Sequence, residues 1–235
     1  MENSEFFDNI KKGLIVSCYS NHDYNVLFSE HNAMLALAKS VALGGAAAIR
    51  VNLMHIAMLK KEIDIPIYGI EKIYRGKEMR ITPTLKEVEA LVNTGADAIA
   101  IDATCRERFD NHSLCDFIKE IKKRFDIPLL GDIATYNEAA HVQDCGIDAV
   151  STTLAGYTPQ SESIGKLGEI PVPEPDYDLI IRIKQNLTIP VIAEGRFNTP
   201  EKAAKALECG AHSVVVGTAI SNPQKITELF CHYLR

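Results

Sequence analysis

Short apolar runs alternate with longer segments of helical periodicity along almost the whole chain. A short run that is apolar throughout is typical of a strand buried on both faces, whereas apolar positions spaced three and four apart are typical of a helix with one buried face. The pattern predicts strands at 13–18, 46–52, 67–72, 96–104, 129–133, 147–153, 191–195 and 211–217. It predicts helices at about 30–43, 54–62, 84–94, 112–125, 136–145, 175–186, 200–209 and 223–233.

The strands begin in two ways that alternate along the chain. Four follow a glycine that ends the preceding helix, and three follow an Ile-Pro pair, because a proline costs least at the first residue of a strand. The glycines are Gly45, Gly95, Gly146 and Gly210, and the prolines are Pro66, Pro128 and Pro190, which recur every 62 residues. The chain therefore repeats one strand–helix unit.

Eight such units in 235 residues predict an α/β fold, a single (β/α)8 TIM barrel that spans 1–235, with 1–11 as a short N-terminal lead-in. An open, doubly wound sheet is the alternative, but the first strand–helix turn has no G-x-G-x-x-G motif to favour it. The longest connection, 154–174, follows the sixth strand, and a loop of that length is usually functional or mobile.

Composition and charge narrow the function. The chain is 46% hydrophobic and 24% charged, with a formal net charge of −6, whereas nucleic-acid-binding proteins usually present a basic face. The acidic start, 1–5, lacks the basic and apolar regions of a signal peptide, and no apolar run is long enough to span a membrane. We therefore expect a cytoplasmic protein without nucleic-acid or membrane partners. Its six cysteines include no CxxC pair, and we expect free thiols.

Polar and ionisable residues stand at the end of every predicted strand. In a barrel these ends converge on one face, which holds the active site in known enzymes of this fold. The residues are Ser17, Tyr19, Arg50, Asn52, Lys72, Asp102, Thr104, Asp132, Thr152, Thr153, Glu194, Arg196, Gly217 and Thr218. Any one of them fits an ordinary solvated strand end, but the whole set indicates a site.

Lys72 and Glu194 are the candidate proton-transfer groups, because they lie four strands apart, on opposite sides of the predicted barrel. A lysine near another cation such as Arg50 has a lowered pKa and can act as a base. Such a pair suits the removal and return of a proton at a carbon next to a carbonyl. Two alternatives stay open at this point: Lys72 as a solvated or Schiff-base lysine, and Glu194 as the ion-pair partner of Arg50 or Arg196.

The other strand ends suggest binding roles. Asp102 and Asp132 fit the orientation of substrate hydroxyls or the tuning of the Lys72 pKa, or equally a structural role as acceptors for loop amides. Gly195 and Gly217–Thr218 follow the seventh and eighth strands, where barrels commonly bind phosphate with backbone N–H groups. No histidine pair stands at a strand end, which argues against a catalytic metal; the histidines, including His55, His112, His141 and His232, fall mainly in helices and loops.

Taken together, the strand-end segments resemble the N-acetylmannosamine-6-phosphate 2-epimerase (N-acylglucosamine-6-phosphate 2-epimerase) family of bacterial sialic-acid catabolism. The segments are GLIVSC (13–18), AIRVN (48–52), AIDAT (100–104), DIAT (132–135), TTLAGYT (152–158), IAEGR (192–196) and VVGTAI (215–220). They cover about residues 12–233 in the family's order, and as a set they are specific.

The resemblance implies a (β/α)8 enzyme without a metal or other cofactor that inverts C2 of a phosphorylated amino sugar by deprotonation and reprotonation. It implies that Lys72 and Glu194 exchange the protons and that Arg50 and Asp132 hold the substrate. We add Asn52, Asp102, Tyr19 and Thr153 as candidate substrate contacts, and Gly195, Arg196, Gly217 and Thr218 as candidate phosphate contacts. A homodimer is implied as well.

Two positions depart from the family's usual pattern. Tyr19 stands where the family usually has glutamine, and Asn222 stands where it usually has arginine. The resemblance implies that both family residues touch the substrate or its phosphate. The competing hypotheses are a related phosphosugar isomerase or aldolase with another substrate, and a sugar-phosphate-binding barrel without activity. Retention of both Lys72 and Glu194 argues against the last.

Overall fold

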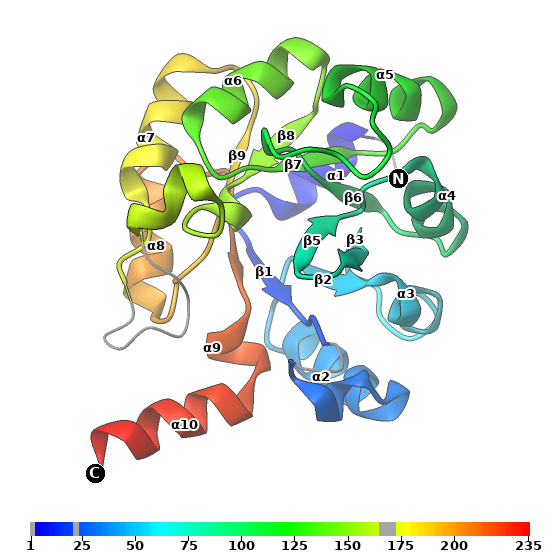
Figure 1. The fold of residues 1–235 in the computed structure, drawn as a ribbon. Helices are drawn as coiled ribbons and strands as arrows, with labels where there is room; N and C mark the ends of the chain where they lie inside the picture. Colours follow the sequence, from blue (N-terminus) through cyan, green and yellow to red (C-terminus); the bar gives the residue numbers. More distant parts are fainter. Residues whose placement is uncertain (1–2, 21–23, 165–172) are drawn as a thin grey trace.

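The structure, a computed structural model, describes residues 3–20, 24–164 and 173–235. Eight parallel strands close into a barrel in the order β1-β10-β9-β8-β7-β6-β3-β2 (Figure 1). They are β1 (Leu14–Ser17), β2 (Ala48–Asn52), β3 (Ile67–Ile70), β6 (Ala98–Asp102), β7 (Leu129–Asp132), β8 (Ala149–Ser151), β9 (Val191–Glu194) and β10 (Ser213–Val216). The (β/α)8 fold predicted from the strand–helix repeat is confirmed.

Helices surround the barrel and follow the strands in sequence (Figure 1). The longer ones are α2 (His31–Leu43), α3 (Leu53–Leu59), α4 (Leu85–Asn93), α5 (Leu114–Arg124), α6 (Tyr136–Cys145), α7 (Tyr177–Asn186), α8 (Pro200–Glu208) and α10 (Pro223–Tyr233). Short helical turns are η1 (Val26–Ser29), η2 (Thr152–Leu154), η3 (Pro159–Ile164) and α9 (Thr218–Ser221). The helix-ending glycines Gly45, Gly95, Gly146 and Gly210 all have φ between 85° and 101°, a conformation that favours glycine.

The lead-in forms a helix, α1 (Asn3–Ile10), that packs into the barrel. Phe6 and Ile10 are fully buried in one hydrophobic cluster with the interior residues Tyr68 and Ile192. Lys12 N–H donates to the carbonyl of His212, directly before β10, at 2.6 Å. Since His212 precedes its strand, α1 closes the end of the barrel where the strands begin, and the opposite end carries the polar strand ends.

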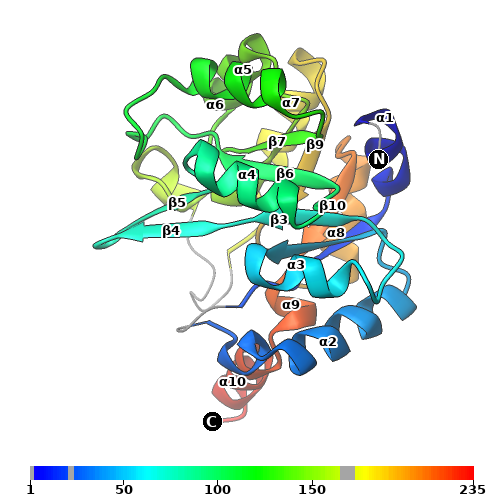
Figure 2. The ribbon, with the colours of Figure 1, turned by 90° about the vertical axis from the view of Figure 1, so that its right-hand side faces the viewer.

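The predicted strand 67–72 differs in the structure. Its barrel portion, β3, ends at Ile70, and Lys72 instead begins a two-stranded antiparallel hairpin, β4 (Lys72–Arg75) with β5 (Glu78–Ile81). The N–H of Glu71 donates to Thr82 Oγ1 at 3.1 Å, and the N–H of Thr82 donates to the Glu71 carbonyl at 2.6 Å. These bonds take the chain out of the barrel sheet, and the hairpin extends from the barrel in Figure 2.

The last helix, α10, has no buried side chain. It projects from the barrel in Figure 1, and it carries exposed apolar residues, among them Phe230 at 66% and Tyr233 at 67% exposure, with Leu234 just after it at 83%. An apolar helix face that does not pack against its own barrel is typical of a surface that contacts another molecule.

The expectation of free thiols is wrong for two of the six cysteines. Cys115 on α5 and Cys145 on α6 form a disulfide, with Cα atoms 4.8 Å apart. Spacing in the sequence gave no sign of this pair, because it joins neighbouring helices of the ring. Among the described residues, no helix is both long and apolar enough to cross a membrane.

Candidate active site

Arg50, in the middle of β2, is the centre of a buried polar cluster near the strand ends. Its guanidinium is 1% exposed and donates to Asp132 Oδ2 at 2.6 Å, to Thr153 Oγ1 at 3.0 Å and to Glu194 Oε2. Burial alone disfavours its charge, but the carboxylates of Asp132 and Glu194 outweigh that effect and raise its pKa above the usual value. The ion pair of Glu194 with Arg50, which the sequence left open, is present.

Thr153, at the turn η2 after β8, joins the same groups through one hydroxyl. Its Oγ1 lies 2.6 Å from Asp132 Oδ1 and 2.9 Å from Glu194 Oε2. The backbone of Glu194 is held in turn by Thr152, whose hydroxyl accepts from its N–H at 2.9 Å and donates to its carbonyl at 2.8 Å. Consequently, the Glu194 carboxylate is fixed by β2, β8 and its own strand β9.

The pKa of Lys72 is affected by the charges of Arg50, Glu194 and Asp132. Burial, together with the positive charge of Arg50, lowers its pKa to about 8, although the carboxylates of Glu194 and Asp132 act in the opposite direction. Its ammonium lies 3.9 Å from the centre of the Tyr19 ring, a cation–π contact that favours the charged form. A lysine with a pKa near 8 is partly neutral at physiological pH and can therefore accept a proton.

Asp132 is fully buried between these groups. Burial, together with the negative charge of Glu194, raises its pKa to about 6 in spite of the opposing effect of Arg50. Tyr68 lies below Arg50, with the guanidinium carbon 5.1 Å from the ring centre. Burial also raises the pKa of Tyr68 well above its usual value, so its phenol remains neutral. The site thus holds one arginine, one lysine of lowered pKa and two carboxylates close together at one end of the barrel.

The chain is similar in sequence and structure to proteins of one known family. Residues 34–235 match a family model described as "Putative N-acetylmannosamine-6-phosphate epimerase". The chain belongs to this epimerase family. A relative from Caldanaerobacter subterraneus subsp. tengcongensis, named "Putative N-acetylmannosamine-6-phosphate 2-epimerase", is 41% identical over 234 residues, which cover 98% of this chain and 94% of that one.

Two further relatives support the assignment to the epimerase family. A protein of the same name from Clostridioides difficile is 42% identical over 225 residues, covering 95% of this chain and 96% of its own. A solved structure, of the N-acetylmannosamine-6-phosphate 2-epimerase from Clostridium perfringens, superposes with a TM-score of 0.87 at 38% identity and covers 97% of this chain and 95% of that one.

Within the epimerase fold, the remaining predicted substrate contacts have different surroundings. Asn52, at the end of β2, is 7% exposed, and its Oδ1 is buried with no hydrogen-bond partner among the described residues. Asp102 is bound locally instead: its Oδ1 accepts from Thr104 and its Oδ2 pairs with Arg106 at 2.5 Å. Asn52 therefore retains an acceptor for a ligand, whereas Asp102 fits the structural role that the sequence left open.

The predicted phosphate contacts of the epimerase family separate into two groups. Gly217 and Thr218 lie beside the first loop, where Thr218 Oγ1 is 2.8 Å from Tyr24 Oη. Gly195 has a φ of 111° and leads into Arg196, which has a φ of 65°. The Arg196 guanidinium donates to the carbonyls of Ala155 at 2.9 Å and Glu174 at 3.1 Å, both in the connection between β8 and α7. Residues 165–172 of that connection lie outside the described residues.

Tyr19 and Asn222, the two positions that depart from the family's usual pattern, have different surroundings in the structure. Tyr19 lines the site through its contact with Lys72. Asn222 is 1% exposed, and its Oδ1 accepts from the N–H of Lys225, so it caps the start of α10. A capping role explains an asparagine at this position without any contact to a ligand.

Sequence reasoning missed three neighbours of the candidate proton-transfer groups Lys72 and Glu194. Ser151 Oγ lies 3.4 Å from Glu194 Oε2 and 3.0 Å from Thr153 Oγ1. The Tyr68 ring makes a cation–π contact with the Arg50 guanidinium. The centre of the Tyr24 ring lies 6.2 Å from the centre of the Tyr19 ring. Strand alternation places Ser151 on the face of Thr153 and was the available signal for it. Tyr24 gave no such signal, because its loop approaches β10 only in the folded chain.

Proposed function

We propose that this chain is an isomerase that inverts C2 of N-acetylmannosamine 6-phosphate to give N-acetylglucosamine 6-phosphate, by metal-free deprotonation and reprotonation. The observation that carries the proposal is the pairing of Lys72, with its pKa of about 8, and Glu194, held by Arg50 and Thr153, in one cluster of charges. Membership of the epimerase family supplies the substrate class for that pair.

The chemistry needs an acidic proton at C2. In a ring-opened sugar, C1 is a carbonyl, and removal of the C2 proton leaves an enolate whose charge rests on the carbonyl oxygen. One of Lys72 and Glu194 accepts the proton from C2, and the other delivers a proton to the opposite face, which inverts the centre. The two groups then return to their starting protonation states in the reverse reaction or by exchange with solvent.

Binding of the substrate is assigned to groups around this pair. The free acceptor of Asn52 suits an N–H or hydroxyl donor of the amino sugar, since a buried acceptor without a partner is costly. Arg50, which also pairs with Asp132, fixes the carboxylate of Glu194, and both Arg50 and Asp132 are proposed to hold the substrate. The backbone at Gly217 and Gly195, with the hydroxyl of Thr218, is proposed to hold the phosphate.

We also propose that the protein is a homodimer and that it is cytoplasmic. The exposed Phe230, Tyr233 and Leu234 at the end of α10 are the apolar surface that a second copy would cover. Sedimentation equilibrium should give twice the chain mass, and the double variant Phe230→Ser/Tyr233→Ser should shift the equilibrium toward monomer. A wild-type chain that sediments as a monomer at all concentrations contradicts the dimer.

Turnover of N-acetylmannosamine 6-phosphate in D2O, followed by proton NMR, tests the function directly. We expect N-acetylglucosamine 6-phosphate to appear with deuterium at C2. Turnover of the 6-phosphate but not of unphosphorylated N-acetylmannosamine would support the phosphate site. A Schiff base on Lys72, trapped by borohydride as a mass increase, would favour an aldolase instead, and binding without conversion would favour a non-catalytic protein.

A further inference from the structure

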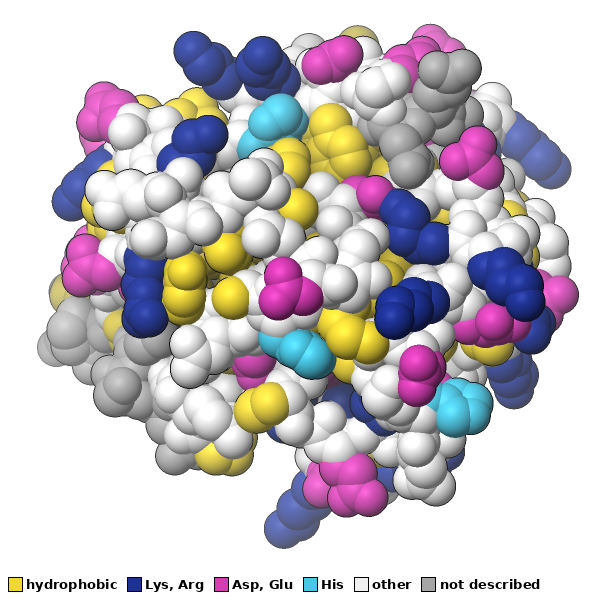
Figure 3. All heavy atoms as spheres, turned by 90° about the horizontal axis from the view of Figure 1, so that it is seen from above, with side chains coloured by type: hydrophobic (Ala, Val, Ile, Leu, Met, Phe, Trp, Pro, Cys, Tyr) yellow, Lys and Arg dark blue, Asp and Glu magenta, His cyan; other side chains and the backbone are white. Residues whose placement is uncertain are grey.

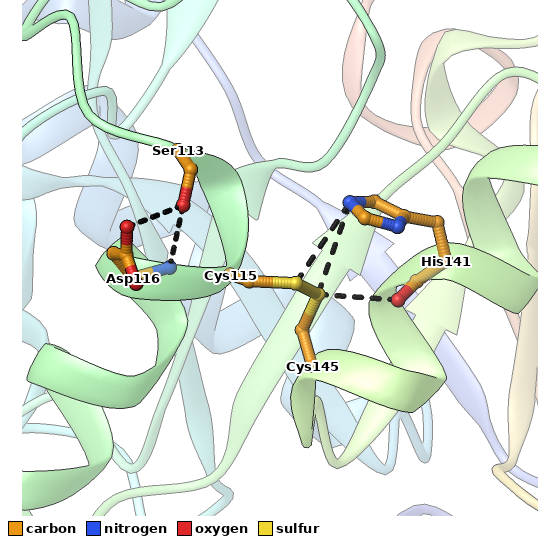
Figure 4. Close-up of a disulfide and its surroundings, with 5 residues drawn as sticks. All are labelled: Ser113, Cys115, Asp116, His141 and Cys145. Carbon is orange, nitrogen blue, oxygen red and sulfur yellow. Dashed lines mark hydrogen bonds between the residues drawn. A yellow bond between two sulfur atoms is a disulfide. The ribbon is translucent and has the colours of Figure 1, made fainter.

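A cluster of sulfur and imidazole donors lies between α5 and α6, away from the strand ends. Cys115 comes from the first turn of α5, and His141 and Cys145 come from α6. Figure 4 shows the His141 ring turned toward both sulfurs. Among the described residues, it is the one group of His, Cys, Asp and Glu side chains found close enough together to hold a metal, with all three donor atoms within 4.8 Å of one another.

We propose that Cys115, His141 and Cys145, when the two cysteines are reduced, bind a soft divalent metal ion of the Zn²⁺ class. Two thiolates and one imidazole form a donor set that selects such ions over hard cations such as Mg²⁺. His141 and Cys145 are four residues apart on α6, a spacing that places both side chains on the same face of a helix. Cys115 completes the set from the neighbouring helix.

The distances suit tetrahedral coordination. His141 Nε2 lies 3.8 Å from each sulfur. Bonds of about 2.3 Å to sulfur and 2.0–2.1 Å to nitrogen give a tetrahedral edge of about 3.5 Å between nitrogen and sulfur, and about 3.8 Å between two sulfurs. The two edges to His141 therefore need only small shifts.

The third edge, between the sulfurs, depends on the oxidation state. In the structure the two sulfurs are bonded to each other. Two molecules of an external thiol reduce that bond to two cysteine thiols and are themselves joined as one disulfide. Without the covalent bond, the sulfurs must separate to van der Waals contact, which brings them near the separation that a tetrahedral metal requires. Metal binding then releases both thiol protons to solvent.

Access and burial also fit a bound ion. His141 is exposed, Cys115 is partly buried and Cys145 is buried, so the cluster reaches the surface on one side. Cys145 Sγ lies 3.2 Å from the carbonyl oxygen of His141, one turn earlier in α6. Three protein ligands leave one position for water or another small ligand. Figure 3, a view from the side of α5 and α6, shows acidic and basic side chains interspersed, without a wide basic patch that would repel a cation.

The experiment is a titration of the full chain with Zn²⁺ and, separately, with Co²⁺. The protein is first reduced with a phosphine, which is then removed under anaerobic conditions. We expect one equivalent of Zn²⁺ per chain in competition with a chromophoric chelator, and with Co²⁺ the charge-transfer absorption of a cobalt–thiolate bond. The affinity should fall as the pH is lowered, because protons compete for both thiolates.

Two variants with matched controls identify the ligands. His141→Ala and Cys115→Ser should each weaken Zn²⁺ binding by more than about 100-fold, the upper end of the losses seen when only a residue that hydrogen-bonds to a metal ligand is changed. His112→Ala and Cys105→Ser, which alter an exposed histidine and an exposed cysteine outside the cluster, should bind as the wild type does. Cys145 is not replaced, because it is buried and its replacement would disturb packing, whereas Cys115 and His141 are closer to the surface.

Three outcomes overturn the proposal. The first is that the reduced wild type takes up no stoichiometric Zn²⁺. If an oxidised low-molecular-weight thiol nevertheless re-forms the Cys115–Cys145 disulfide in that protein, the two cysteines form only a disulfide. The second is equally tight binding in His141→Ala and Cys115→Ser. The third is a cobalt complex without thiolate absorption.

Discussion

Replacement of Glu194 by glutamine is expected to lower kcat for the proposed epimerisation by about 10²–10⁴-fold, the range over which a positioned acid or base contributes. Glutamine keeps the shape of the side chain and can still accept from the Thr153 hydroxyl, which lies 2.9 Å away. It cannot accept or deliver a proton. Lys72→Met should cause a loss of the same size, and both variants should fail to incorporate deuterium at C2, as measured by proton NMR in D2O.

Matched variants separate this loss from general damage. Glu201→Gln changes an exposed carboxylate in the first turn of α8, and Lys77→Met changes an exposed lysine at the turn of the β4–β5 hairpin. Both should keep wild-type turnover, and all four proteins should unfold at similar urea concentrations. Full deuterium exchange in either Glu194→Gln or Lys72→Met would contradict the proton-transfer role of that residue.

The pH profile of the wild type gives a second check on Lys72. Its pKa is lowered to about 8, so the neutral amine that accepts a proton becomes the main form only above that pH. Hence kcat/KM should rise as the pH is increased through about 8 and then level off, since kcat/KM follows groups of the free enzyme. A profile that stays flat across this range would indicate that Lys72 does not act as the base.

The barrel was predictable because its signals are local. Each helix-ending glycine has a positive φ, and each Ile-Pro pair precedes a buried strand, so single residues mark where the units begin. The strand ends followed from the same pattern, because parallel strands of a barrel all point their last residues to one face. This is why Arg50, Asp132, Thr153 and Glu194 could be grouped before any contact between them was known.

Other features depend on contacts that no local pattern records. Lys72 was placed at the end of a barrel strand, but the bonds between Glu71 and Thr82 make it the first residue of a hairpin. Arg196 was a candidate phosphate contact because it follows the seventh strand, and its guanidinium binds the carbonyls of Ala155 and Glu174. Which partner each side chain binds depends on contacts between distant segments of the folded chain. The candidate site residues could therefore be predicted from the sequence, but their hydrogen-bond partners could not.

The stability of the site itself depends on Arg50, and Arg50→Met is expected to reduce the free energy of unfolding by about 3–5 kcal/mol. Methionine fills most of the volume but removes the cation between two carboxylates. Asp132, which is fully buried, and Glu194, whose side chain is 16% exposed, are then left as unpaired negative charges. Urea unfolding followed by circular dichroism measures the loss.

The pH dependence of this loss distinguishes charge from packing. In wild type, burial already raises the pKa of Asp132 to about 6, and without Arg50 that pKa should rise further. A carboxyl whose folded pKa is raised binds more protons in the folded state than in the unfolded state, so stability decreases as the pH rises between the two pKa values. The deficit of Arg50→Met should therefore be small near pH 5 and largest above neutral pH.

Two further variants complete the argument. Lys39→Met breaks an exposed pair with Glu62 and should unfold at the same urea concentration as wild type, because solvent screens such a pair. The double variant Arg50→Met/Asp132→Asn removes the buried Asp132 charge together with its partner and should recover part of the loss. If Arg50→Met unfolds within about 1 kcal/mol of wild type at neutral pH, the ion pairs of Arg50 do not hold the site together.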